Sequence, residues 1–255
     1  MNGAIYFIIA GTVIGILTLI KPNFFWNHPK AAFVRRFLGD RGTTIFYLLA
    51  SVAMLSFGIY SMTKINAGKE LEEISTLYQN GKVDDAQKRL LSYTSDHYNE
   101  YLAWTILGHT YLDQENFEKA IESYNNGIQA DTTAFEPHSG LGLVYAKMGE
   151  YEKAKNAYEK ANAISPNKGS VIGNLAGLYD DLGDIKKSIE YGEKSIQLDP
   201  TDVTLVVNLS VYYNKAGQID KRDQMFNKAK ELGYTDLQAL TDTYSINNDT
   251  TSTKE

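Results

Sequence analysis

A period of 34 residues runs through most of the chain and constrains its fold more than any other feature. With repeats starting at residues 67, 101, 135, 169 and 203, the same kinds of side chain recur at equivalent positions. Position eleven is Leu or Tyr in every repeat, position fifteen is Gly in four of the five, and position twenty is Ala in the first three. A unit of this length holds two helices of about a dozen residues each and two turns. The pattern predicts an α-solenoid of about five helix pairs over residues 67–236.

The second repeat carries a motif that is specific to one family. The stretch WTILGHTY matches the pattern W-x2-L-G-x2-Y, and Ala120 and Tyr124 continue it. Thr132 replaces the usual closing proline, which Pro166 and Pro200 restore in the next two repeats. On these residues the region 67–236 resembles the tetratricopeptide repeat family. Repeats two to four match well, whereas the first and fifth are degenerate, as expected of capping repeats.

Gly108 raises a question, because a glycine inside a helix costs roughly 1 kcal/mol relative to alanine. Position eight is small in four repeats, as Gly108, Gly142, Ala176 and Ser210. We therefore interpret Gly108 as a packing residue that lets the two helices of a repeat meet. The glycines at position fifteen are expected to end each first helix in the left-handed conformation, and Asp184 and Asp220 are candidate caps of second helices. The structural positions of the repeats are Trp104, Gly108, Tyr111, Ala120, Gly142, Tyr145, Ala154 and Tyr179.

The first 62 residues predict a membrane hairpin. Residues 4–20 and 43–62 are uncharged runs of 17 and 20 residues, which are long enough to cross a bilayer. A cleaved signal peptide fits poorly, because the first three residues carry no Lys or Arg. Phe24, Phe25, Trp26, Tyr47 and Tyr60 suit interfacial anchoring. A linker is expected at residues 63–66, and a capping segment with a disordered polar tail at 237–255.

Lys and Arg counts predict the orientation of this hairpin. The loop 21–42 carries five of these residues and the N-terminus none, while three (Lys64, Lys69 and Lys82) follow the second span. The positive-inside rule then places the loop in the cytoplasm and the repeats outside it, at a bacterial inner membrane. Gly11 and Gly15 form a GxxxG motif, which serves either packing within the hairpin or formation of a homodimer.

The loop has a resemblance of its own. The stretch NFFWNHPKAAFVRRFLGDRGTTIFYLLA (residues 23–50) is similar to a family of two-helix bacterial membrane proteins, immunity protein family seventeen. The matching features are the Phe/Trp cluster, Lys30, Phe33, Arg36, and the series Gly39, Gly42, Phe46 and Tyr47, although Thr44 stands where the family has Arg. The resemblance implies an immunity-type context near polymorphic toxins.

The sequence contains none of the common catalytic, metal-binding or nucleotide-binding motifs that we looked for. It has no Cys, which excludes disulfides, thiol catalysis and Cys-type metal sites. His28, His97, His109 and His138 form no HExxH pair, and there is no GxxxxGK[ST] or GxGxxG. Residues 63–255 carry a net charge of −10, which argues against a nucleic-acid partner. We therefore expect no enzymatic activity, no metal and no cofactor.

The family resemblance implies that the first helices line a concave groove for an extended peptide. Carried over by position, the candidate binding residues are Thr105, His109, Asp113, Leu143, Lys147, Asn174, Asp181, Asn208, Val211 and Lys215. Asn174 and Asn208 lie one period apart, and an amide can both donate to and accept from a peptide backbone. The family's arrangement for holding a C-terminal carboxylate is absent, since Thr105 and His109 occupy its positions.

The sequence therefore predicts an all-α protein with a two-helix membrane hairpin followed by a tetratricopeptide solenoid. Its expected function is non-catalytic binding of a protein or peptide segment, as a scaffold or assembly factor for an envelope or secretion complex. The alternative is an immunity protein whose hairpin neutralises a toxin in the membrane.

Overall fold

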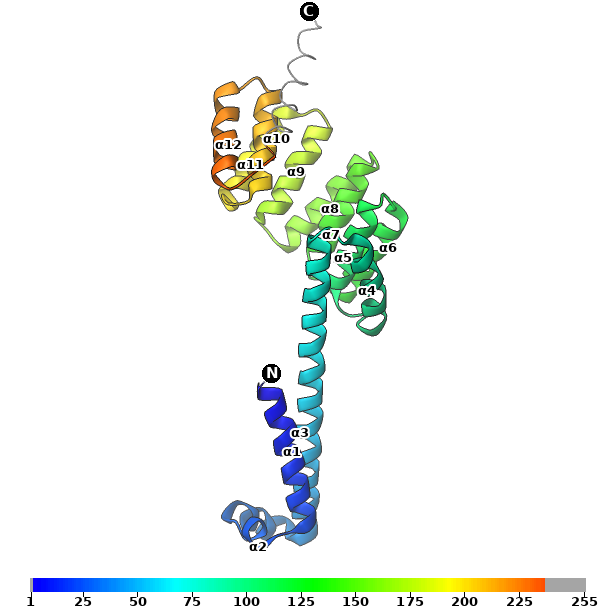
Figure 1. Ribbon diagram of the computed structural model, residues 1–255, viewed down its shortest axis with the longest axis vertical. Coiled ribbons are helices and arrows are strands. Elements are labelled where there is room, and N and C mark those ends of the chain that lie inside the picture. The colour runs from blue at the N-terminus through cyan, green and yellow to red at the C-terminus, as the bar shows by residue number, and fades with distance from the viewer. Residues whose placement is uncertain (1, 237–255) are drawn as a thin grey trace, which may run out of the picture. The chain divides into compact units, whose positions relative to one another are not determined.

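The structure is a computed structural model that describes residues 2–236, apart from the side chains of Asn2 and Phe24. The described residues form helices joined by short turns and contain no strand (Figure 1), which confirms the all-α fold. The chain divides into two compact units, Met1–Thr76 and Leu77–Glu255. The polar tail predicted at 237–255 and the anchoring role predicted for Phe24 lie outside the part that is described.

The first unit is built from three helices. These are α1 (Asn2–Ile20), the single-turn α2 (Asn23–Trp26), and α3 (Pro29–Gln79), which continues into the second unit. Gly39 interrupts α3 with φ 68° and ψ 176°, a backbone conformation that favours glycine. The rings of Phe25 and Tyr47 meet edge to face at 5.6 Å and join α2 to α3. The Lys21 ammonium lies 4.9 Å from the ring centre of the buried Trp26.

The glycines of the first unit let α1 and α3 approach closely. A Cβ atom on Gly11 would lie 2.9 Å from the carbonyl oxygen of Ser51, and one on Gly15 would lie 3.2 Å from Ser51 Oγ. From the other side, a Cβ atom on Gly58 would lie 2.9 Å from the backbone nitrogen of Ile8. The GxxxG motif thus serves packing within the hairpin, and a homodimer through Gly11 and Gly15 stays a prediction.

Two helices of this unit are long and apolar enough to cross a membrane, by length and composition. The most apolar 18-residue window of α1 has a mean hydropathy of 2.3, and that of α3 has a mean hydropathy of 1.8. Only 17% of the α1 window and 11% of the α3 window is buried within the structure. Residues 63–66, expected as a linker, instead lie inside α3. They contain neither Pro nor Gly, so nothing in the sequence ends the helix between the apolar segment and the first repeat.

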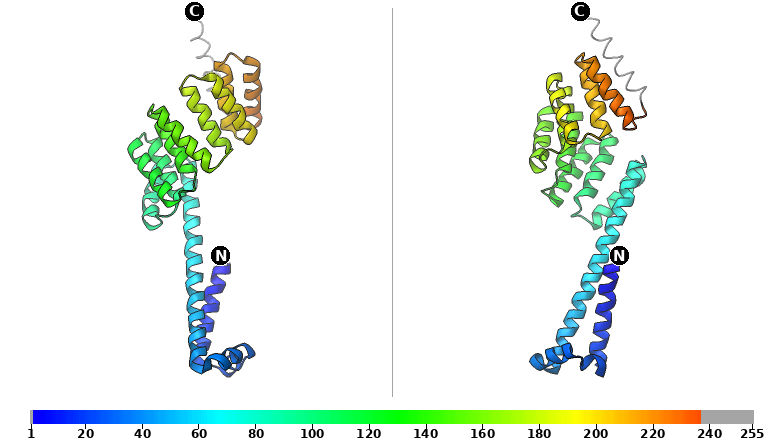
Figure 2. Two further views of the ribbon diagram at one scale, coloured as in Figure 1. Left: turned by 180° about the vertical axis from the view of Figure 1, so that it is seen from behind. Right: turned by 90° about the vertical axis from the view of Figure 1, so that its left-hand side faces the viewer.

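The second unit consists of helix pairs (Figures 1 and 2), and the boundaries of these pairs follow the 34-residue period. After the end of α3 come α4 (Val83–Asp96), α5 (Tyr101–Asp113), α6 (Phe117–Ala130), α7 (Glu136–Lys147), α8 (Tyr151–Ile164), α9 (Gly169–Asp181), α10 (Ile185–Leu198), α11 (Val203–Lys215) and α12 (Ile219–Glu231). The five second helices begin at residues 83, 117, 151, 185 and 219, which is a spacing of 34 each time. Each of these helices begins at position seventeen of the repeats as they are numbered above.

Position fifteen adopts the left-handed conformation in every repeat, as predicted for a helix end. Gly81, Gly149, Gly183 and Gly217 have φ between 70° and 76°, and Glu115 is forced to φ 57°. An L residue in this region loses roughly 1–2 kcal/mol relative to its preferred conformations. The second repeat therefore carries backbone strain that the other repeats avoid.

Replacing Glu115 with Gly should stabilise the repeats by about 0.5–1 kcal/mol, because relief of the strain exceeds the added freedom of the unfolded chain. The reverse change at an equivalent turn, Gly183→Glu, should destabilise them by about 1 kcal/mol. Urea unfolding of the two variants measures both effects. Equal midpoints would show that these turns do not constrain φ.

Of the two aspartates predicted to cap second helices, one does so and the other does not. Asp184 caps α10, because its side chain accepts a hydrogen bond from the backbone N–H of Lys187 at 3.1 Å. Asp220 is not a cap: α12 begins at Ile219, so Asp220 lies inside the first turn and Gln218 occupies the N-cap position. Asn116 and Asp202, which were not predicted, cap α6 and α11 with their side chains.

Position eight packs against a tyrosine of the second helix. A Cβ atom on Gly108 would lie 2.6 Å from the Tyr124 ring, and one on Gly142 would lie 2.5 Å from the Tyr158 ring. Gly140 of the next repeat contacts the Tyr124 ring as well, so this ring lies between two glycines. Packing was predicted correctly, but its partner is an aromatic ring rather than the backbone of the opposite helix.

Candidate binding surface on the first helices

The contacts between helices show which side of the solenoid is concave. Consecutive first helices touch one another, α5 with α7, α7 with α9, and α9 with α11. The extensive contacts of each second helix are instead with the first helices of its own and the next repeat. The first helices are therefore closer together, and their free sides form the inner surface of the array. We call this the concave surface, and most of the predicted binding residues lie on it.

The two predicted asparagines differ in what they contact. The Asn174 amide nitrogen on α9 donates to Ser139 Oγ on α7 at 3.0 Å. The residue equivalent to Ser139 that precedes Asn208 is Gly173, which has no side chain to accept such a bond. Asn208 is partly buried and keeps its amide available. Asn174 is thus a link between repeats, and Asn208 is the better candidate for a peptide backbone.

The predicted residues of the second repeat are used by the solenoid itself. Thr105 is buried and donates its hydroxyl to the backbone oxygen of Tyr101 at 2.8 Å. It therefore cannot contact a partner, which corrects the prediction made for it. His109 Nδ1 lies 2.9 Å from the hydroxyl of the fully buried Tyr124. Burial lowers the pKa of His109, and the nearby Asp113 only partly opposes this effect.

Charges alternate along the array at position thirteen, as Asp113, Lys147, Asp181 and Lys215. The two outer members form links between neighbouring repeats. Asp113 accepts a hydrogen bond from the Tyr78 hydroxyl at 2.7 Å. The Lys215 ammonium contacts both carboxylate oxygens of Asp180, at 2.8 and 2.7 Å.

The middle members of this row are exposed. Lys147 and Asp181 form no ion pair or side-chain hydrogen bond within residues 2–236. Partial burial of its carboxyl group and the adjacent Asp180 raise the pKa of Asp181, whereas Lys215 lowers it. Leu143 and Val211 are partly buried on the same side of α7 and α11. The concave surface thus offers one cation, one anion and two apolar side chains, together with the amide of Asn208 and the remaining N–H and carbonyl oxygen of Asn174.

The residues that link the repeats were mostly missed from the sequence. Tyr78 with Asp113, Ser139 with Asn174, and Asp180 with Lys215 are each 35 residues apart. A search for complementary side chains one period plus one residue apart would have found all three pairs. Within residues 2–236 no group of three His, Cys, Asp or Glu side chains could hold a metal ion.

Comparison with family models identifies the repeats. A TPR repeat model matches residues 108–149, and two tetratricopeptide repeat models match residues 135–168 and 170–202. This region consists of tetratricopeptide repeats. The matches cover repeats two to four, which are also the repeats that carry the clearest motif.

Known sequences and structures are similar to parts of this chain. A stretch of 46 residues is 44% identical to protein bimA of Emericella nidulans, a match that covers 18% of this chain and 6% of that protein. A thermophilic TPR protein of Thermus thermophilus has a TM-score of 0.64 at 19% identity, covering 71% of this chain and 98% of its own. PilF of Pseudomonas aeruginosa has a TM-score of 0.56 at 15% identity, covering 71% and 88%. At these identities the structural likeness shows the fold alone.

Proposed function

We propose that this protein is a membrane-anchored scaffold without catalytic activity, which binds an extended protein segment on the concave surface of its tetratricopeptide repeats. The observation that carries the proposal is the set of available side chains on α7, α9 and α11. The amide of Asn208 is suited to a peptide backbone, because it both donates and accepts. Leu143 and Val211 add apolar contact, and the separated charges of Lys147 and Asp181 favour one direction of the bound segment.

The apolar helices support the membrane part of this proposal. Windows of 18 residues with such hydropathy match the length of a bilayer crossing. The five Lys and Arg residues between them favour a cytoplasmic loop. The repeats then face outward, in a periplasm, where a scaffold can serve an envelope or secretion complex.

Anchoring and orientation are tested together. The full chain should remain in the membrane fraction after a carbonate wash, and a variant lacking residues 2–62 should move to the soluble fraction. Protease added to intact spheroplasts should digest the repeats without lysis. Protection of the repeats until lysis would reverse the orientation, and a full chain in the soluble fraction would contradict the anchor.

The partner is sought by crosslinking in intact membranes followed by capture of the full chain. The expected result is one enriched protein that is lost when Val211→Asp places a charge on the concave surface. Lys186 is exposed on α10, so Lys186→Asp serves as the matched control. This variant should still capture the partner. The immunity-type resemblance stays a prediction, since the family matches lie at residues 108–202 and not in the first 62.

A further inference from the structure

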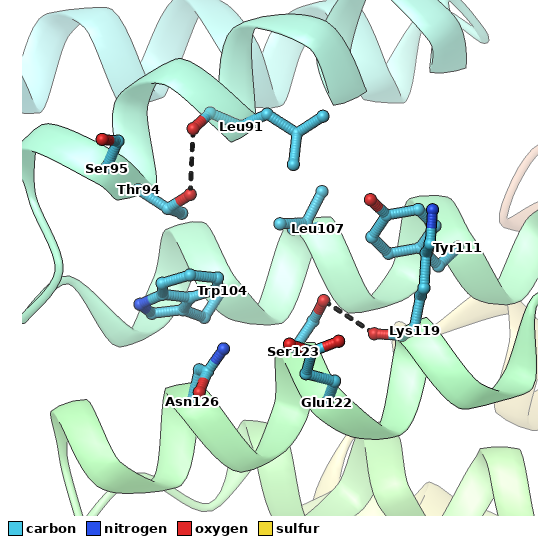
Figure 3. Close-up of a pocket in the computed structure, with 10 residues that line it drawn as sticks. All are labelled: Leu91, Thr94, Ser95, Trp104, Leu107, Tyr111, Lys119, Glu122, Ser123 and Asn126. Atoms are coloured by element: carbon cyan, nitrogen blue, oxygen red, sulfur yellow. Dashed lines mark hydrogen bonds between the residues drawn. The ribbon is translucent and has the colours of Figure 1, made fainter.

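Two cavities lie away from the concave surface, at successive junctions between repeats. The first has a volume of about 310 Å³ and is formed by α4, α5 and α6 (Figure 3). The second has a volume of about 430 Å³ and is formed by α6, α7 and α8. Each of the nine residues that line the second cavity lies 34 residues after one that lines the first. We call them the first and second junction pockets.

The two pockets are built on the same plan. In the first, Leu107 lies between Trp104 and Tyr111 on α5 (Figure 3). In the second, the equivalent residues on α7 are His138, Leu141 and Tyr145. A lysine of the second helix reaches over each tyrosine, Lys119 at 5.3 Å from the Tyr111 ring centre and Lys153 at 5.4 Å from that of Tyr145. Cavities of about 300–1,000 Å³ are the usual size of ligand sites.

The two pockets share a small side chain at one position of the repeat. Position twenty-three of the repeat is Ser123 in the first pocket and Ala157 in the second. In the fourth repeat the same position is Tyr191, whose ring stacks on Tyr179 with a centre distance of 5.2 Å and an angle of 28°. The side chains at position twenty-three of the two pockets are much smaller than this tyrosine, which makes the position suitable for a substitution that adds bulk.

The pockets differ in charge. Lys119 and Glu122 both line the first pocket, so its lining carries one cation and one anion. The second pocket is lined by Lys153, Lys160 and His138 and by no acidic residue. Lys153 pairs with Glu150 at 2.5 Å outside the lining, whereas Lys160 is exposed and forms no ion pair within residues 2–236. Burial and the charge of Lys160 lower the pKa of His138, which favours the neutral imidazole.

The second junction pocket therefore combines an apolar floor with a cationic edge. Leu141, Tyr145, Ile128 and Ala157 supply the apolar surface, and Asn125 and Asn156 add amide groups. Residues 63–255 carry a net charge of −10, so a pocket with cations and no acid departs from its surroundings. We propose that it binds an acidic segment of a partner protein, with a large apolar side chain on Leu141 and Tyr145 and a carboxylate beside Lys160. This surface is separate from the concave one and its occupant is independent of the proposed scaffold function.

The test uses the full chain in a non-ionic detergent and three dye-labelled pentapeptides with the cores Glu-Phe-Glu, Glu-Ala-Glu and Lys-Phe-Lys. Fluorescence anisotropy should show that Glu-Phe-Glu binds best and that added salt weakens it. The variant Lys160→Glu should weaken it by about fivefold or more. The variant Ala157→Tyr, which introduces the residue that the fourth repeat carries at this position, adds bulk to the lining and should weaken it by about tenfold.

The matched control is Ser123→Tyr, which fills the first pocket and should leave affinity for Glu-Phe-Glu unchanged. Circular dichroism reports the folding of each variant. If Ala157→Tyr does not fold, Lys160→Glu still tests the proposal, because Lys160 is exposed and its replacement should leave the fold intact. Equal binding of Lys-Phe-Lys would overturn the proposal. So would undiminished binding to Lys160→Glu, or equal losses from the Ser123 and Ala157 variants.

Discussion

Replacing Gly142 with Leu is expected to destabilise the repeats by about 3 kcal/mol, at the upper end of the cost of overpacking a core. The first added carbon would already lie 2.5 Å from two atoms of the Tyr158 ring. That ring is only 2% exposed and packs in a cluster with Ala154, Ile172, Leu175 and Leu178. Neither the ring nor the helices can move without opening this cluster, because protein cores are densely packed.

Trp104 provides a direct measurement of this effect. The chain has two tryptophans, Trp26 and Trp104, so a Trp26→Phe background leaves one reporter, in the repeats. The Gly142→Leu variant should melt about 6–12 °C below this background.

Two alanine variants form the matched control. Gly142→Ala should lower the melting temperature, whereas Gly177→Ala should raise it slightly, because a Cβ atom on Gly177 would meet only the Tyr212 hydroxyl, at 3.7 Å. The gain at Gly177 is about 0.5–1 kcal/mol of helix preference. Equal melting of Gly142→Leu and the background would show that Tyr158 does not lie against α7.

The second large effect concerns affinity. Removing the amides of both Asn174 and Asn208 should weaken binding of the concave partner by about tenfold to thirtyfold, since each lost hydrogen bond costs about 1 kcal/mol. The two single variants should differ. Asn208→Ala should reduce affinity and leave stability unchanged. Asn174→Ala should reduce affinity and also lower stability, because the Asn174 amide donates a hydrogen bond to Ser139 Oγ at 3.0 Å.

Ser139→Ala separates the two roles of Asn174. It removes the acceptor on α7 and keeps the amide, so stability should fall by about 0.5–1.5 kcal/mol while affinity stays the same. Titrations use the segment that crosslinking identifies, with circular dichroism as the folding control. Undiminished affinity of a folded double variant would place the binding site away from these amides.

The period and the turn residues made the fold predictable. Helix starts follow directly from a 34-residue register that hydrophobic and small residues repeat five times. The left-handed turns follow from glycine at position fifteen, and the sequence also indicates Glu115 as the exception. Gly108 was recognised as a packing residue because its position is small in four repeats. Its contact with Tyr124 was not predictable, since it depends on how the second helix is rotated.

The candidate site was less predictable, because position within a repeat does not reveal what a side chain contacts. Thr105 and Asn174 occupy positions that the family uses for binding, yet one bonds its own helix and the other bonds the neighbouring repeat. Thr105 uses a backbone carbonyl that any helix supplies, whereas the contact of Asn174 depends on the side chain of Ser139. The junction pockets were missed for a similar reason, because each is lined by residues of three helices that are distant in the sequence.

The proposed function requires that the concave surface receives a protein partner at the membrane. A photo-crosslinking amino acid at Val211, in the full chain in native membranes, tests it most directly. The matched site is Lys186 on the exposed side of α10. We expect one partner adduct from position 211, none from position 186, and loss of the adduct in the Asn174→Ala/Asn208→Ala background. No adduct at position 211, or equal adducts at both positions, would contradict it.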